Sequence, residues 1–268
     1  MMNNILIGIA TCSFYGISWL LLMLRLRDTR STYTPGMGRT ALFPACLGAL
    51  FHVGLLTELL IMPTGLSFSF AYSLSLFTWV SVVIILLMSW RANVETLNLL
   101  SLPIAILSIV LAVLTPVHQN HVTHLNPQLE IHIIISIIAY CVLTVAALLA
   151  ILLAIQDKQL HEHRISRFVQ TLPALVTMEN LLFKVIESGF VLLTLALITG
   201  FAYTSNWFNH KIIFSVIAWL VFLCLLLGRH IAGWRGKIAI RWTLGGFMLL
   251  MLAFFGSKFV LEIILHRS

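Results

Sequence analysis

The chain has few charged residues. Asp, Glu, Lys and Arg make up 9% of its 268 residues, whereas a typical soluble domain has about 25%. Hydrophobic residues reach 60%, so the folded chain cannot have water as its main solvent. The sequence also lacks the Gly-x-Gly-x-x-Gly, Gly-x-x-x-x-Gly-Lys-Ser/Thr, His-Glu-x-x-His and Gly-x-Ser-x-Gly motifs of soluble enzymes. These absences argue against a nucleotide-driven pump and a hydrolase, and we expect that the protein is not an enzyme.

Paired cysteines are missing as well. The four cysteines lie inside apolar stretches and form no Cys-x-x-Cys pair, whereas a thiol-exchange enzyme needs a paired and accessible thiolate. We therefore expect them to pack as small hydrophobic side chains. The net charge of +7 comes from short loops, where cations orient a membrane protein and contact anionic lipid. We predict lipid, and no nucleic acid, as a partner.

Eight apolar stretches are each long enough to cross a hydrocarbon core of about 30 Å at about 1.5 Å per helical residue. We predict an all-α, polytopic membrane protein, a single integral domain over residues 1–268 with eight transmembrane helices. Four predicted spans lie in 1–115 and four in 130–268. The first is expected to be a retained anchor helix, because no cation precedes it and no small-residue cleavage site follows it. The predicted spans are 5–24, 41–61, 68–90, 97–115, 130–156, 181–203, 211–228 and 238–265.

The loop cations lie in alternate connections between these spans. The positive-inside rule makes those connections cytoplasmic. Both termini and the connections near 62–67, 116–129 and 204–210 are then expected on the periplasmic side of a bacterial inner membrane. The cytoplasmic connections carry Arg25, Arg27, Arg30, Arg39, Arg91, Lys158, Arg164, Arg167, Arg229, Arg235, Lys237 and Arg241. The periplasmic side carries His118, His121, His124, His132, His210 and His266.

His52 lies close to the middle of the second span, where an imidazole needs a partner inside the protein. One interpretation is a neutral histidine that is hydrogen-bonded to a neighbouring carbonyl or hydroxyl group. The other is a ligand, because neutral imidazole is a common protein ligand of haem iron and of transition metals.

His132 lies in the first turn of the fifth span, on the periplasmic side. Ser136, Tyr140 and Thr144 follow it at intervals of four residues, so all four share one helix face. This polar face is either an ordinary helix start at the interface or one wall of a periplasm-facing pocket headed by His132.

Three further histidines, His118, His121 and His124, are spaced three apart between the fourth and fifth spans. Imidazoles at this spacing can converge on zinc or copper if the segment is helical. Pro116 and Pro127 indicate a loop, so a solvated loop and a metal or haem-edge site both stay open.

Two other histidines on the predicted periplasmic side could have a structural role instead of a role as ligands. His266 follows Glu262 by four residues, and Glu262 follows Lys258 by four, so the three can form an ion-pair ladder. His210 beside Lys211 is typical of an anchor at the membrane interface. Either histidine could instead be a ligand.

The C-terminal half contains four recognisable segments, Leu-Glu-Ile-His-Ile-Ile-Ile-Ser-Ile-Ile-Ala-Tyr at 129–140, His-Lys-Ile-Ile-Phe-Ser-Val-Ile-Ala-Trp at 210–219, Gly-Trp-Arg-Gly-Lys-Ile-Ala at 233–239 and Phe-Gly-Ser-Lys-Phe at 255–259. In these segments the chain resembles the cytochrome c assembly family, the haem-handling CcsA, CcmC and CcmF group. Within that family it is most similar to the YpjD- and HemX-like inner-membrane proteins. The resemblance covers about 130–268 well, and the Gly-Trp-Arg-Gly turn is its most specific element.

This resemblance implies haem bound by histidines at the periplasmic face. His132 matches the external histidine that heads the tyrosine-containing helix, while His266 and His230 match approximately two further family histidines. The family's tryptophan-rich segment ending in Asp-Pro-Lys-Glu is replaced at 203–211 by Tyr-Thr-Ser-Asn-Trp-Phe-Asn-His-Lys. The haem-presenting platform is therefore largely missing. We expect haem binding, sensing or an accessory role in cytochrome c biogenesis rather than transfer of haem to apocytochrome.

Our interpretation is a periplasm-facing pocket that holds haem, with His132 as the first candidate ligand and His52 as the second. His52 lies about 10 Å deeper than His132, so the two need not share one iron. His124 or His210 is then an alternative partner of His132. The candidate cofactor-binding residues are His132, His52, His124, His210, His266 and Tyr140, and the candidate metal ligands are His118, His121 and His124.

Two other classes of function stay open. A transporter or ion-homeostasis component would use His52, Glu58 and the histidine-containing loop as a polar path. A non-catalytic partner subunit of a membrane complex would use a cytoplasmic surface around Arg164, Arg167 and Arg235.

Overall fold

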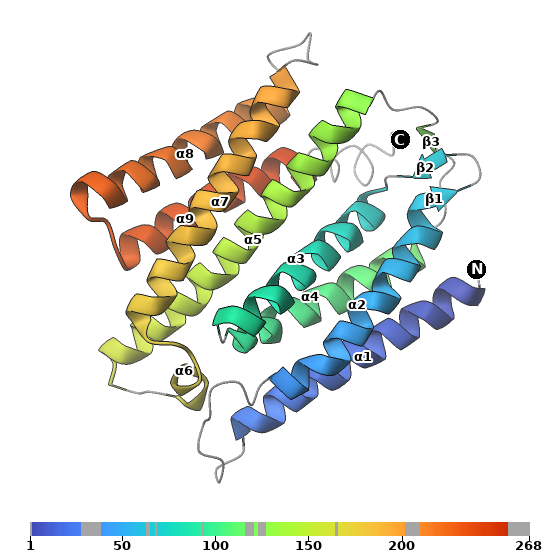
Figure 1. Cartoon of the computed structure of the whole chain (residues 1–268), viewed down its shortest axis with the longest axis horizontal. Helices are drawn as coiled ribbons and strands as arrows, with labels where there is room; N and C mark the ends of the chain where they lie inside the picture. The colour runs from blue at the N-terminus through green and yellow to red at the C-terminus, as the bar shows by residue number, and fades with distance from the viewer. Residues whose placement is uncertain are drawn as a thin grey trace. The chain divides into compact units, whose positions relative to one another are not determined.

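The computed structural model describes residues 2–27, 39–62, 65–67, 69–92, 94–115, 121–122, 127–163, 166–201 and 210–256 (Figure 1). It contains 8 helices that are long and apolar enough to cross a membrane. The prediction of an all-α protein with eight transmembrane helices is therefore confirmed. The spans are Asn3–Leu26, Thr40–Leu60, Phe70–Ala92, Glu95–Leu114, Leu129–His161, Leu175–Phe201, Lys211–Ala232 and Lys237–Phe254.

The chain divides into two compact units. The N-terminal unit consists of Met1–His124 and Glu162–Pro173, and the C-terminal unit of Leu125–His161 and Ala174–Ser268. Each unit contains four of the eight spans. The prediction that all of them form a single integral domain stays a prediction.

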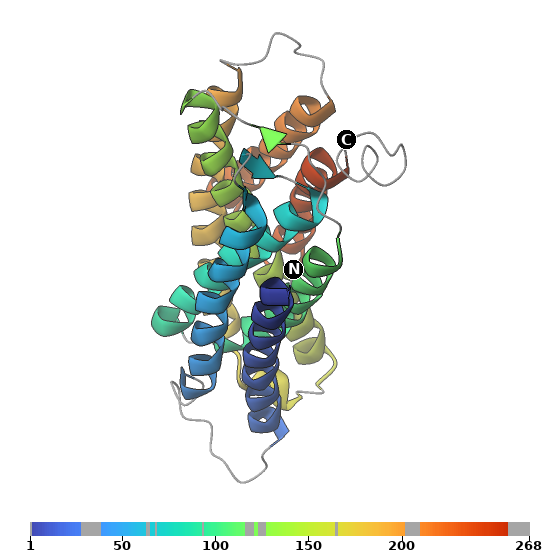
Figure 2. The same cartoon turned by 90° about the vertical axis from the view of Figure 1, so that its right-hand side faces the viewer.

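In the N-terminal unit, α1 packs along α2 and against α4, while α3 packs against α2 and α4 (Figures 1 and 2). Two indole groups connect these helices, because a polar N–H inside an apolar core needs an acceptor. Nε1 of Trp19 donates to the carbonyl of Leu99 at 3.2 Å, and Nε1 of Trp79 donates to that of Ala49 at 2.8 Å. The helices are α1 (Met2–Arg27), α2 (Arg39–Leu60), α3 (Phe70–Ala92), the 3-10 turn η1 (Glu95–Leu97), α4 (Asn98–Leu114) and the short α6 (Arg167–Gln170).

A small three-stranded antiparallel sheet, which the sequence did not predict, belongs to the same unit. β1 (Ile61–Met62) pairs with β2 (Gly65–Ser67), and β2 pairs with β3 (His121–Val122). In this register Ser67 lies opposite His121. The sheet joins the segment after α2 to the segment between α4 and α5.

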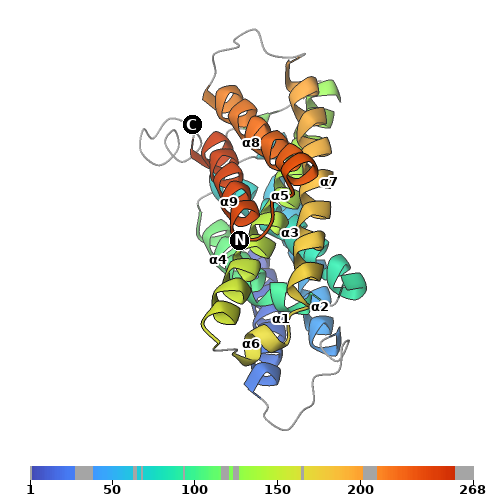
Figure 3. The same cartoon turned by 90° about the vertical axis from the view of Figure 1, so that its left-hand side faces the viewer.

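In the C-terminal unit, α5 and α7 form an antiparallel pair that is in contact along most of its length (Figures 1 and 3). α8 is inclined to α7, and α9 packs against both α8 and α5 (Figure 3). Gly189 of α7 allows the close approach to α5, since a Cβ atom there would lie 2.6 Å from Cδ2 of Leu143. The helices are α5 (Pro127–His161), α7 (Leu175–Phe201), α8 (His210–Ala232), α9 (Lys237–Met251) and the π-helical turn η2 (Leu252–Gly256).

This contact predicts the effect of adding one methyl group. Gly189→Ala should destabilise the protein by about 1–3 kcal/mol, because the new Cβ overlaps Leu143 in a packed interface. Gly245→Ala on α9 is the matched control, since a Cβ there meets nothing within 4 Å. The thermal unfolding midpoints of the two variants in detergent measure the difference, and equal midpoints would contradict the predicted packing.

Candidate functional site

His132 lies near the start of α5, and its imidazole contacts α7. Its Nδ1 is 3.0 Å from Oγ1 of Thr199. The Thr199 hydroxyl donates its single hydrogen to the carbonyl of Leu195 at 2.9 Å and is 3.1 Å from the carbonyl of Ala196. Because those carbonyls only accept, Oγ1 of Thr199 offers His132 a lone pair, so Nδ1 carries the imidazole hydrogen. The lone pair of the neutral ring is then on Nε2.

The second ring nitrogen of His132, Nε2, has different surroundings. Among the described residues, no side chain forms a hydrogen bond to Nε2 of His132, and the residue is only half-buried. Gly200 accommodates the ring, since a Cβ atom at that position would lie 2.9 Å from Cε1 of His132. The backbone of Ala196 also interacts with this ring, so the structure shows an imidazole anchored to α7 whose Nε2 has no described side-chain partner.

Tyr140 lies two turns further along α5 and faces different helices. Its hydroxyl is 3.2 Å from Oγ of Ser215 on α8, and its ring centroid is 5.7 Å from that of Phe254 in η2. Oγ1 of Thr144 donates to the carbonyl of Tyr140 at 2.8 Å, as a helical threonine commonly does. Although they share one helix face, His132 and Tyr140 thus bind separate partners.

His52 is fully buried in the N-terminal unit. Its Nδ1 is 3.3 Å from the hydroxyl of Tyr15 on α1, and its Nε2 is 2.9 Å from Oγ of Ser75 on α3. Both ring nitrogens are therefore occupied, and the imidazole connects three helices. These contacts favour a neutral, hydrogen-bonded histidine, because an iron or another metal would have to replace one of the two hydroxyl partners.

The structure describes only some of the other candidate histidines. His118, His124 and His266 lie outside the described residues, as do the cations Arg164 and Lys258. The backbone of His121 is in β3, and His210 is the first residue of α8. Among the side chains that the structure describes, no group of three His, Cys, Asp or Glu residues could hold a metal ion. The three-histidine metal site stays a prediction.

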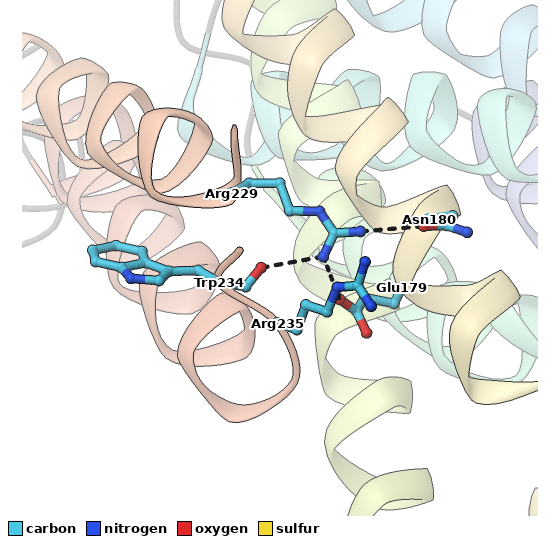
Figure 4. Close-up of polar contacts among 5 residues, drawn as sticks. All are labelled: Glu179, Asn180, Arg229, Trp234 and Arg235. Atoms are coloured by element: carbon cyan, nitrogen blue, oxygen red, sulfur yellow. Dashed lines mark hydrogen bonds and ion pairs between the residues drawn. The ribbon is translucent and has the colours of Figure 1, made fainter. Parts of the chain in front are cut away.

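A buried ion pair that the sequence analysis missed lies at the other end of the C-terminal unit (Figure 4). Nη1 of Arg229 is 2.9 Å from Oε1 of Glu179, which is 7% exposed, and 3.3 Å from the carbonyl of Trp234. Nη2 donates to Oδ1 of Asn180 at 3.3 Å. Nε of the exposed Arg235 lies 3.9 Å from the same Glu179 oxygen. One carboxylate therefore has two cationic neighbours.

The Gly-Trp-Arg-Gly turn is built around this guanidinium group. Gly233 and Gly236 have φ values of 64° and 52°, a left-handed conformation that favours glycine. The N–H of Trp234 donates to the carbonyl of Gly228 at 3.1 Å, and its own carbonyl accepts from Arg229. The turn was visible in the sequence, whereas its partner Glu179 is 50 residues from Arg229 and no local period connects the two.

His230, which the family resemblance matched to a histidine of that family, lies beside this turn. Its Nε2 is 4.0 Å from Oε1 of Glu187, and the two side chains are 70% and 49% exposed. An ion pair so exposed contributes little to stability.

The buried ion pair between Arg229 and Glu179 predicts that removing one of its charges strongly lowers the stability of the protein. Arg229→Ala should destabilise the protein by about 3 kcal/mol, because it leaves Glu179 buried with only the more distant Arg235. Arg241→Ala, at an exposed position of α9, should change stability by less than about 0.5 kcal/mol. We would measure thermal unfolding of both variants, of Glu179→Gln, and of the double variant Glu179→Gln/Arg229→Ala. The comparison gives the interaction free energy between Arg229 and Glu179. Additive effects of the two substitutions would contradict a direct interaction.

Comparison with known proteins adds an independent finding. The family model described as Cytochrome C assembly protein matches residues 43–265. The chain is 34% identical over 239 residues to Inner membrane protein YpjD of Escherichia coli K12, an alignment that covers 85% of this chain and 89% of that protein. It is 25% identical to Cytochrome c biogenesis protein CcsA of Guillardia theta, covering 70% and 71% of the two chains. It is 23% identical to Protein HemX of Bacillus subtilis, covering 68% and 70%. No solved structure matches the chain.

Proposed function

The chain belongs to the cytochrome c assembly protein family, and from this premise we propose that it is a multi-pass inner-membrane protein that binds haem at His132. The family resemblance expected from its C-terminal segments is confirmed by the family match and by the similarity to YpjD, CcsA and HemX. In this proposal the chain has an accessory or regulatory role and is not a complete haem lyase.

The hydrogen bond between His132 and Thr199 is the observation that carries the proposal. An axial ligand of haem iron is a neutral imidazole whose second nitrogen is held by a hydrogen bond inside the protein. His132 fits this requirement, because Nδ1 is fixed by Thr199 at 3.0 Å and Nε2 keeps its lone pair. His52 fits it less well, since Tyr15 and Ser75 occupy both of its nitrogens. Bound haem would supply the iron centre, and this chain would supply the ligand and its orientation.

The position of His132 supports a periplasmic site. In the C-terminal unit, α5 begins at the same end at which α7 ends, and His210 begins α8 after a connection of a few residues. Lys158, Arg235 and Lys237 lie at the opposite end, where α5 ends and α8 turns into α9. The positive-inside rule assigns that cationic end to the cytosol. We therefore place the His132 end of this unit in the periplasm.

Two features support the accessory role. The segment at 203–211 contains one tryptophan, where haem-presenting members of the family have a tryptophan-rich platform. In this proposal His210, which the sequence analysis gave as one alternative partner of His132, would be the second ligand, and it belongs to the C-terminal unit as His132 does. A haem held between histidines of one unit suits retention or sensing better than delivery to another protein. Tyr140, which binds Ser215, then positions α5 against α8 rather than contacting the iron.

Haem titration of the purified protein tests the proposal. The wild type should develop a Soret band, and His132→Ala should weaken it strongly. Thr199→Val has nearly the same shape but no hydroxyl acceptor for Nδ1, so it should lower haem affinity about 10–100-fold. Thr199→Ser keeps the hydroxyl and should restore most of the affinity.

Thr177→Val is the matched control, because Thr177 is an exposed threonine on the same helix, near its opposite end. It should leave the Soret titration unchanged. Wild-type protein that takes up no haem, or equal affinity in the wild type and His132→Ala, would overturn the assignment of His132.

Cysteine labelling in intact cells tests the proposed orientation. In a variant without the four native cysteines, His121→Cys should react with a membrane-impermeant maleimide from outside the inner membrane. Ser166→Cys, at an exposed position between α5 and α7, should react only after the membrane is opened. The reverse pattern would contradict a periplasmic haem site.

A further inference from the structure

The turn between α3 and α4 contains three buried polar side chains that each have an oxygen atom without a hydrogen-bond partner. The atoms are Oε1 of Glu95, Oδ1 of Asn98 and Oγ of Ser101. The three residues are 5%, 0% and 5% exposed, respectively. No other described residue forms an ion pair with Glu95. A carboxylate buried in this way is costly unless a positive charge or hydrogen-bond donors reach it.

The backbone places these three residues on one face of the turn. Glu95 begins the 3-10 turn η1, in which side chains three residues apart eclipse each other, so Asn98 lies above Glu95. Ser101 follows one turn later in α4. Nδ2 of Asn98 donates to the carbonyl of Glu95 at 3.1 Å and to Oγ of Ser89 at 3.2 Å. Since a carbonyl only accepts, these bonds fix the amide orientation and leave Oδ1 as an acceptor without a donor.

Neighbouring groups do not supply the missing donors. The hydroxyl of Ser89 donates to the carbonyl of Ile85 at 2.7 Å, and Oγ1 of Thr96 is 3.4 Å from Oγ1 of Thr171. Glu95 does not act as a helix cap either, because neither η1 nor α4 has a side-chain hydrogen bond at its N-cap. In the part of the chain that the structure describes, Oε1 of Glu95 is thus a buried carboxylate oxygen without a hydrogen-bond donor.

We propose that Glu95, Asn98 and Ser101 bind a monovalent alkali cation. The three available groups are a carboxylate, an amide carbonyl and a hydroxyl, all oxygen ligands of the kind that hard cations take. A single positive charge would neutralise Glu95, whereas a divalent ion would leave a net charge in a poorly solvated site. The site lies at the start of the fourth span rather than at its middle.

The bound cation would stabilise the α3–α4 turn and the segment that is attached to it. Thr171, which follows α6, contacts Thr96 of η1, and Phe168 of α6 packs against the core of the same unit. Cation binding should therefore raise the stability of the N-terminal unit without any contribution from the haem site.

Thermal unfolding of haem-free protein in detergent tests this site with three salts at equal ionic strength. Sodium chloride or potassium chloride should raise the midpoint by about 2–4 °C relative to choline chloride when the cation is at about five times its Kd. Equilibrium dialysis with radioactive sodium, and with rubidium as a potassium substitute, should show one saturable site per chain. Equal midpoints in all three salts together with no saturable binding of either ion would overturn the proposal.

Three variants identify the ligands. Glu95→Gln keeps the shape of the side chain but removes its charge, so the difference between alkali and choline salts should disappear. Ser101→Ala removes a hydroxyl that has no other partner, and should increase the Kd several-fold without reducing stability in choline chloride. Glu58→Gln changes an exposed carboxylate on α2 and should leave the cation effect intact.

A cation effect that persists in Glu95→Gln would place the ion elsewhere and contradict the proposal. If Glu95→Gln does not fold, Ser101→Ala decides, because an unchanged Kd in that variant would exclude the site. All of these measurements use haem-free protein, so their failure would leave the assignment of His132 untouched, and a failed Soret titration would leave this site untouched.

Discussion

A polar group at membrane depth must find its partner inside the protein, and this constraint governs the arrangement of both units. His52 meets this requirement fully, because the hydroxyl groups of a tyrosine and a serine from two other helices form hydrogen bonds with its two ring nitrogens. Glu179 on α7 and Arg229 on α8 meet this requirement by forming an ion pair with each other. Each of these side chains therefore determines which helices are neighbours, in addition to satisfying its own hydrogen bonds.

The same constraint separates structural polar residues from candidate binding sites. A side chain whose donors and acceptors are all used has no capacity left for a ligand, whereas His132 keeps one nitrogen and Glu95 keeps a carboxylate oxygen. Two imidazoles that are equally conspicuous in the sequence thus receive different interpretations. The distinction depends on hydroxyl groups contributed by other helices, which the sequence around each histidine does not reveal.

The length of the apolar stretches identified all eight spans from the sequence, because burial in lipid is a local property of each segment. Helix ends were predicted less well. The fifth span was expected to end at 156, yet α5 continues to His161, since Lys158, Gln159 and Leu160 favour helix beyond the apolar run. Contacts between helices could not be predicted at all. Thr199 lies 67 residues from His132, and no periodic pattern connects positions so far apart.

The most specific element of the family resemblance has a structural explanation. In the Gly-Trp-Arg-Gly turn, two left-handed glycines direct a backbone carbonyl toward Arg229, which the buried Glu179 holds in place. The pattern therefore describes how α8 is connected to α9, and it carries no haem chemistry of its own. This turn and the proposed ligand site are thus specified by different residues at opposite ends of one unit. The turn and His132 can therefore occur together in a chain that has one tryptophan at 203–211, which is the combination that the proposed accessory role needs.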